Sequence, residues 1–185
     1  MRFVITVLWV LSWTVSLSQT PGAERKGWSI GLGVGGGALS LHHHDTVDAS
    51  FSTSLPNLKV GYQLNPRLAA VVIFQGANYQ VKGKDRGFEG MTVAAQYWLR
   101  DRWWVLGGTG LTFDAPAFYT VKDPAKADFR TGLPALTFAI GYEVYRKGRF
   151  VIDLQYRSFY GRVTLKDNSQ QYGTANMFIV GFSWY

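Results

Sequence analysis

The three histidines of the chain stand in one run, His42-His43-His44, and Asp45 follows directly. Imidazoles clustered beside a carboxylate are ligands that Zn²⁺ or Cu²⁺ accepts. The four side chains therefore form a candidate metal site. We expect it to be weak, because a metal site needs ligands held in place by a supporting shell of contacts.

The same run holds the only histidines that could serve Ser40 or Ser50 as a general base in a hydrolase. Neighbouring positions on a flexible loop do not hold a base within about 3 Å of a nucleophile, so we expect no catalysis. The chain has no cysteine, which excludes a disulfide and a thiol nucleophile. The glycines between residues 31 and 37 lack the Lys-Ser/Thr ending of a phosphate-binding loop, and no cofactor is expected.

Composition limits the class of protein that carries these residues. At 185 residues the chain is long enough for one domain. Charged residues make up 17%, below the roughly 25% usual for soluble domains, while aromatic residues reach 16% and glycines number 21. This composition favours a β-rich protein in unusually apolar surroundings.

The first residues have the pattern of an export signal. Arg2 precedes an apolar stretch over residues 3–15, and Ser16-Leu17-Ser18 supplies small residues at a cleavage position. The stretch is shorter than the ~20 residues that a spanning helix needs. We predict a signal peptide over 1–18, a short N-terminal segment over 19–26 and one domain over 27–185.

Period-two alternation recurs through that domain, as in Trp28, Ile30, Leu32 and Val34 against intervening Ser and Gly. Alternation of this kind indicates β-strands, and no sustained helical period competes with it. We predict eight strands, each with bounds good to a few residues. They cover 27–39, 53–64, 68–81, 88–99, 103–113, 133–145, 150–160 and 174–185.

Short turns alternate with longer polar segments between these strands. The turns follow residues 64, 99 and 145, and the longer segments are 40–52, 82–87, 114–132 and 161–173. The pattern predicts an all-β fold, an eight-stranded antiparallel up-and-down barrel with all turns at one end and all loops at the other. Alternation alone leaves open whether the barrel is soluble or spans a membrane.

The aromatic residues favour a membrane. The tryptophans after residue 26 all fall at strand ends near the turns or termini, and rings of this kind gather at the interfaces of a bilayer. The predicted aromatic girdle comprises Trp28, Trp98, Trp103, Trp104, Trp184 and Tyr185. The turns are basic, which suits an anionic leaflet, and no nucleic-acid-binding motif accounts for the net charge of +7.

Two stretches carry a family resemblance. Residues 95–111, AQYWLRDRWWVLGGTGL, join an aromatic strand end, a charged turn and a glycine-rich strand, and residues 178–185, FIVGFSWY, form an amphipathic last strand. Both resemble the small eight-stranded outer-membrane β-barrels of Gram-negative bacteria, of the OmpA-like or OmpW-like type. The resemblance implies short periplasmic turns, longer external loops and a place in the cell outer membrane. The implied partners are outer-membrane lipids, lipopolysaccharide and the barrel-assembly machinery, which would read the C-terminal strand.

Charged residues on the predicted strands are candidates for the barrel interior. In the resembling family such residues form an ion-pair and hydrogen-bond network, and buried charges are tolerated only when they are paired. The predicted lumen network comprises Lys59, Glu89, Glu143, Asp153 and Arg157.

We expect a structural or surface-interaction role without catalysis, with loop 114–132 as the preferred contact site. One alternative is a narrow channel or a binder of a small apolar molecule. Its lumen would then be lined by Val71, Ile73, Val105 and Leu111. A second alternative is an outer-membrane enzyme that modifies lipid A.

Overall fold

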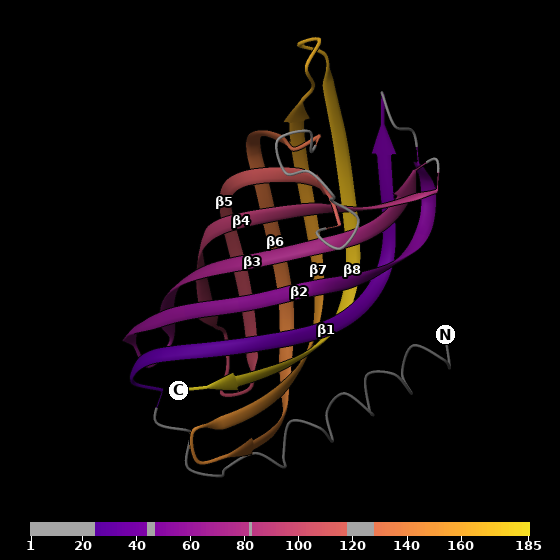
Figure 1. Cartoon of the computed structure of the whole chain (residues 1–185). Helices are drawn as coiled ribbons and strands as arrows, with labels where there is room; N and C mark the ends of the chain where they lie inside the picture. Colours follow the sequence, from indigo (N-terminus) through magenta and orange to yellow (C-terminus); the bar gives the residue numbers. More distant parts are fainter. Residues whose placement is uncertain (1–24, 44–46, 82, 118–127) are drawn as a thin grey trace, which may run out of the picture.

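Eight antiparallel strands close into one barrel in the computed structural model (Figure 1). The structure describes residues 25–43, 47–81, 83–117 and 128–185. The strands are β1 (Gly27–His42), β2 (Val47–Asn65), β3 (Leu68–Val81), β4 (Lys84–Trp98), β5 (Trp103–Pro116), β6 (Arg130–Lys147), β7 (Phe150–Thr164) and β8 (Gln170–Trp184). Each strand pairs with its neighbours in sequence, and β1 pairs with β8 to complete the circle. The described residues include no helix long and apolar enough to cross a membrane.

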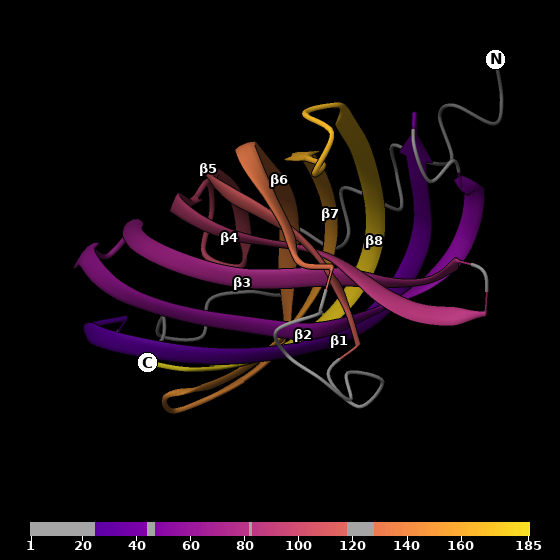
Figure 2. The same ribbon diagram turned by 45° about the horizontal axis from the view of Figure 1, so that its top comes forward.

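The strands tilt steeply around the barrel. In two views, β1, β2 and β3 run across one wall, and β6, β7 and β8 stand at a steep angle to them (Figure 1 and Figure 2). The connections at residues 66–67, 99–102 and 148–149 share one end with Gly27 and Tyr185, which we call the turn end. The opposite end, which contains His42 and Gln170, is called the loop end.

The eight predicted strands are confirmed, but most extend farther toward the loop end. β2 begins at Val47 and β4 at Lys84, and β7 continues to Thr164. Polar residues beyond the apolar stretch keep pairing with the neighbouring strand, because a closed barrel satisfies their backbone groups there as well. The connections therefore shorten to residues 82–83 between β3 and β4, and to 165–169 between β7 and β8.

The apolar stripe faces outward. Trp28, Ile30 and Leu32 are all more than half exposed, whereas Ser29 between them is buried inside. A soluble barrel has the reverse arrangement, with apolar side chains inside and polar side chains outside. The barrel is therefore of the membrane-spanning type, as the aromatic pattern predicts.

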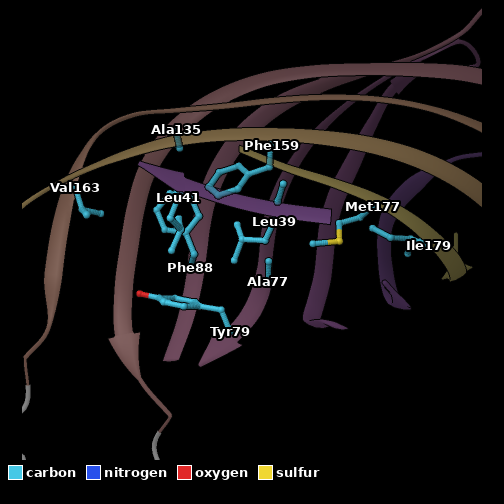
Figure 3. Packing of buried hydrophobic residues seen from close by; sticks show 11 residues of the cluster. Leu39, Leu41, Ala77, Tyr79, Phe88, Ala135, Phe159, Val163, Met177 and Ile179 are labelled. Carbon is cyan, nitrogen blue, oxygen red and sulfur yellow. The ribbon is translucent and has the colours of Figure 1, made fainter. Parts of the chain in front are cut away.

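Side chains fill the interior in two apolar clusters. The cluster nearer the loop end includes Leu39, Leu41, Phe88, Phe159 and Met177, whose side chains converge on one another in Figure 3. The second cluster lies nearer the turn end and contains Val71, Ile73, Leu106, Val151 and both buried tryptophans. Polar side chains lie between the clusters and at both ends of the lumen. An eight-stranded barrel is just wide enough for its own side chains, which is the state observed here.

Glycine is required where β1 approaches β8 most closely. A Cβ atom on Gly37 would overlap the carbonyl oxygen of Asn176 and lie 2.8 Å from the Cα of Met177. Those atoms belong to the backbone and cannot move as a flexible side chain does. The close approach occurs where the first and last strands close the barrel, since Gly37 pairs with Met177.

Gly37→Ala should therefore destabilise the barrel by about 2 kcal/mol, the usual cost of overpacking a filled site. The measurement is equilibrium unfolding in lipid vesicles, followed by tryptophan fluorescence. Gly107→Ala is the matched control, because a Cβ there meets only the Phe138 ring at 3.7 Å. Equal losses for the two variants would contradict the assignment of the close approach.

Candidate functional site

A buried carboxylate organises the turn end of the lumen. Glu143 on β6 is 1% exposed, and the Arg25 guanidinium donates from 3.0 Å to each of its oxygens. Arg146 also forms an ion pair with Glu143. It forms another ion pair, at 2.9 Å, with Asp101 of the β4–β5 turn. The Trp98 indole donates to Glu143 at 2.7 Å. The N-terminal segment and the β4–β5 turn are thus tied to β6 across this opening.

Arg25 is also held by the aromatic ring beneath it. Its guanidinium carbon lies 4.5 Å from the centre of the Trp98 ring, a distance at which the cation is attracted to the ring face. Tyr185 packs edge-on against the same tryptophan, with ring centres 6.2 Å apart. Together these side chains cover the turn end of the lumen.

A second buried carboxylate organises the loop end. Asp114 on β5 is fully buried and accepts hydrogen bonds from Tyr79 at 2.9 Å, Arg86 at 2.9 Å and Gln171 at 3.1 Å. Arg130 donates to it from 3.3 Å. These partners come from β3, β4, β6 and β8, so one side chain links five of the eight strands.

Asp128 forms an outer layer above that carboxylate. It lies 2.6 Å from Arg130, 3.6 Å from Arg86 and 3.9 Å from Lys166. Partial burial raises the pKa of Asp128, but the hydrogen bond from Arg130 and the charges of the three cations outweigh burial. The pKa therefore lies below its ordinary value, and the carboxylate stays charged at neutral pH.

Two small cavities lie between the two ends, among the residues that the structure describes. One cavity of about 10 Å³ lies among Gly31, Asn57, Lys59 and Arg157, and another of about 10 Å³ lies beside Gln75 and the loop-end apolar cluster. A volume of that size is about what one water requires. No continuous apolar pore is present among the described residues.

Comparison with solved structures places this geometry in a known fold. Neisserial surface protein A has a TM-score of 0.61 and 16% identity, and the match covers 86% of this chain and 97% of that one. The fold is that of the small outer-membrane β-barrels. Weaker matches include Ail of Yersinia pestis, with a TM-score of 0.49, 16% identity and coverage of 86% and 99%. The N-terminal barrel of Pseudomonas aeruginosa OprF has a TM-score of 0.45 and 12% identity, and the match covers 89% of this chain and 100% of that one.

No protein-family model matches the chain, and no curated protein is similar to it in sequence. The expected fold class is nevertheless confirmed by the strand order and by the outward apolar face. A closed barrel with that face lies in the cell outer membrane, among outer-membrane lipids and lipopolysaccharide. The signal peptide predicted over 1–18 lies outside the described residues.

Part of the predicted aromatic girdle faces the bilayer. Trp28, Trp103 and Trp184 point outward at the turn end of the outer-membrane barrel. Each packs against a neighbouring ring, with centre-to-centre distances of 5.4 Å to Tyr62, 4.9 Å to Tyr142 and 4.9 Å to Phe150 respectively. Such rings suit the boundary between lipid tails and headgroups.

The other three predicted girdle residues face the lumen, which corrects their assignment. Trp98 and Trp104 are each 1% exposed, and Tyr185 is buried as well. Successive side chains on a strand point to opposite faces, so a residue next to an outward Tyr97 or Trp103 must point inward. These rings fill the turn-end cluster and do not contact lipid.

The charged residues predicted to face the lumen lie on both faces of the barrel wall. Lys59, Glu143, Asp153 and Arg157 are buried inside the barrel. Glu89 lies on the outer face, because Phe88 and Gly90 on either side of it are the buried, inward residues of β4. Glu89 is thus not part of the interior. Among the described residues, Glu143 is the one member of the predicted set with an ion pair within 4.0 Å.

The four apolar residues proposed to line a channel also lie on both faces of the barrel wall. Val71 and Ile73 face inward, where they belong to the packed turn-end cluster. Val105 and Leu111 are an even number of residues from the outward Trp103 on β5, so they are on the outward face of the strand. The four side chains therefore do not line one common passage.

The two described histidines of the run, His42 and His43, lie at the loop end of β1. His42 is the last residue of β1 and pairs with Tyr172, and the His43 ring is 5.4 Å from the same tyrosine ring. Both are exposed, whereas His44 and Asp45 lie outside the described residues. No group of three or more metal ligands is found among the residues that the structure describes. The metal site stays a prediction.

Sequence reasoning placed Glu143 in the lumen but missed the loop-end cluster and the arginine of the N-terminal segment. Asp114, Arg86 and Arg130 lie in segments predicted as loops, and Arg25 lies before the first predicted strand. A signal was present on β5, because Asp114 shares the parity of the inward Thr112. Extending the alternation past the apolar stretch would have placed it inside.

Proposed function

We propose that this protein is a sealed outer-membrane barrel with a structural or surface-interaction role at its loop end, and that it is neither a channel nor an enzyme. The observation that carries the proposal is the filled lumen. Buried ion pairs close both ends, and two apolar clusters with polar side chains between them occupy the space in the middle. What remains available for contact outside the bilayer is the polar surface of the loop-end hairpins.

The same observation argues against the alternative of a small apolar ligand in the lumen. Ligand pockets usually enclose about 300–1,000 Å³, whereas each of the two cavities described above holds about 10 Å³. Opening more space would require separating Arg86 and Arg130 from Asp114. Breaking a buried pair of this kind costs about 3–5 kcal/mol.

Solute flux through proteoliposomes tests the sealed lumen. Vesicles that contain the refolded protein should release potassium ions and take up the apolar dye N-phenylnaphthylamine no faster than protein-free vesicles. Asp114→Ala, which removes the anion shared by two buried arginines, is the variant most expected to leak. Rapid flux through the wild-type protein would overturn the proposal.

The second alternative, lipid A modification, has a separate test. A hydrolase needs a base within hydrogen-bond reach of its nucleophile, yet His42 and His43 are exposed at the loop end of β1. Incubation of the refolded protein with lipid A vesicles should leave the lipid mass spectrum unchanged. A new deacylated or acylated species, lost in His42→Ala or His43→Ala, would establish an enzyme.

The C-terminal strand supports a proposed contact with the barrel-assembly machinery. Phe178, Val180 and Trp184 of β8 form an outward apolar stripe, while Tyr185 turns inward against Trp98. We expect the stripe to carry recognition, so Phe178→Ser should slow insertion into membranes that contain the machinery. Tyr185→Phe should leave the rate of insertion unchanged.

A further inference from the structure

The middle of the lumen carries an excess of positive charge. Lys59 on β2 and Arg157 on β7 are 8% and 5% exposed, and Asp153 is the buried carboxylate of this layer. Among the described residues, no carboxylate lies within 4.0 Å of either cation. The buried arginines at the two ends differ, because each is paired with Glu143 or Asp114. The one carboxylate can balance only one of the two positive charges, and an uncompensated buried charge is costly.

The direct polar contacts of the two cations are neutral, and the charge of Asp153 acts on both from more than 4.0 Å away. Lys59 donates to the Gln96 side chain at 3.3 Å, and its Nζ lies 5.6 Å from the centre of the Trp104 ring. Arg157 donates to side-chain amide oxygens only, those of Asn57 at 3.1 Å, Gln75 at 3.3 Å and Gln155 at 2.6 Å. Its buried Nε has no hydrogen-bond partner in the structure. Amides solvate a cation but do not neutralise it.

A cavity lies between these cations. Lys59, Arg157 and the Ser183 hydroxyl all contribute to its wall. Gly31 and Gly33 of β1 also line the cavity, and the Lys59 and Ser183 side chains lie over Gly31, where a Cβ atom would be 3.2 Å from the Lys59 Cε and 3.0 Å from the Ser183 Oγ. The strand register supports this placement, because Gly31 pairs with both Lys59 and Ser183 across the two neighbouring strands.

We propose that this cavity binds one small inorganic anion of the halide type, held between Lys59 and Arg157. The donors available are an ammonium, a guanidinium and a hydroxyl, all of which suit an anion. The volume of about 10 Å³ admits a single atom, and the flexible Lys59 stem supplies the further room that a halide needs beyond a water. A sulfate or phosphate group does not fit without separating the strands.

The position of the site suggests when the ion enters. The cavity lies against the β1–β8 pair, the contact that closes the barrel. An ion enclosed there is taken up as the strands close and is retained afterwards, because both ends of the lumen are covered. The inference goes beyond the proposed function, since a sealed lumen does not itself require a bound ion.

Bromide diffraction tests the site directly. The full mature protein is refolded and crystallised in sodium bromide, and anomalous differences are measured at the bromine absorption edge. We expect one anomalous peak inside the barrel, between the Lys59 Nζ and the Arg157 guanidinium. Density without an anomalous signal at that position would identify water and overturn the proposal.

Thermal unfolding with matched variants gives a second readout. Wild-type protein refolded and measured in chloride should have a Tm about 4 °C higher than protein refolded and measured in gluconate at the same ionic strength, since a ligand stabilises the state that binds it. The rise should vanish in Lys59→Met, and in Gly33→Ala, which places a methyl group in the cavity wall.

The control variants are Lys166→Met, whose side chain is 79% exposed, and Gly107→Ala, which has room for a Cβ. Both should keep the full rise in Tm. If Lys59→Met does not fold, the proposal is tested by comparing the chloride-dependent rise in Tm of Gly33→Ala with that of Gly107→Ala. An equal rise in all variants would show a general salt effect and overturn the proposal.

Discussion

Asp114→Ala should lower the free energy of unfolding by about 3–5 kcal/mol. The carboxylate is the common acceptor for Tyr79, Arg86 and Arg130, and it is fully buried. Its removal takes the buried carboxylate away from two arginines inside the barrel. Denaturant unfolding of the vesicle-inserted protein measures the loss.

Asp128→Ala is the matched control at the same end of the barrel. Asp128 contacts the same two arginines, but more than a third of its side chain is exposed. Exposed ion pairs contribute about 0–1 kcal/mol because water screens them and solvates the separated charges. Should the two variants lose the same stability, Asp114 would not be the residue that holds the loop end together.

Glu143→Ala should cost a similar 3–5 kcal/mol at the turn end. The substitution removes the carboxylate that pairs with Arg25, leaves Arg146 with Asp101, and removes the acceptor of the Trp98 indole. Water should then reach the Trp98 ring, so we expect a red-shifted tryptophan emission in the folded state together with the lower unfolding free energy. Unfolding titrations and emission spectra of the same samples report both.

Glu89→Ala provides the comparison for that result. Glu89 is a half-buried carboxylate on the outer face of β4, and no ion pair of it is found in the structure. Its removal strands no cation, so we expect a change within about 0.5 kcal/mol and an unshifted emission spectrum. A loss as large as that of Glu143→Ala would mean that the inward and outward faces of β4 have been assigned the wrong way round.

The fold could be predicted because its signals are repeated along the chain. Six alternating stretches, two stretches of strand-like composition and three short turns predict an up-and-down barrel, and the structure has that strand order. The errors arose where a residue was assigned by its distance from the strand end, without asking whether its side chain points inward or outward. Trp98 and Trp104 lie at the turn end as predicted, but they occupy the inward positions next to Tyr97 and Trp103.

Glu89 was misplaced for the same reason, since it shares the parity of the outward Met91 and Val93. The partners within the lumen could not be predicted from alternation at all. Arg25 reaches a carboxylate 118 positions away, and Arg157 reaches the Asn57 side chain 100 positions away. Contacts of this kind depend on the stagger between strands and on side-chain length, which a period-two pattern does not specify.

Single-molecule conductance across a planar lipid bilayer tests the central claim, that the lumen is sealed, most directly. After insertion of the refolded wild-type protein, we predict no discrete current steps at any applied potential that the bilayer withstands. Insertion is verified on the same preparation by protection of the barrel from protease. Stable, reproducible openings of the correctly inserted protein would contradict the account, because they require a continuous path past both Asp114 and Glu143.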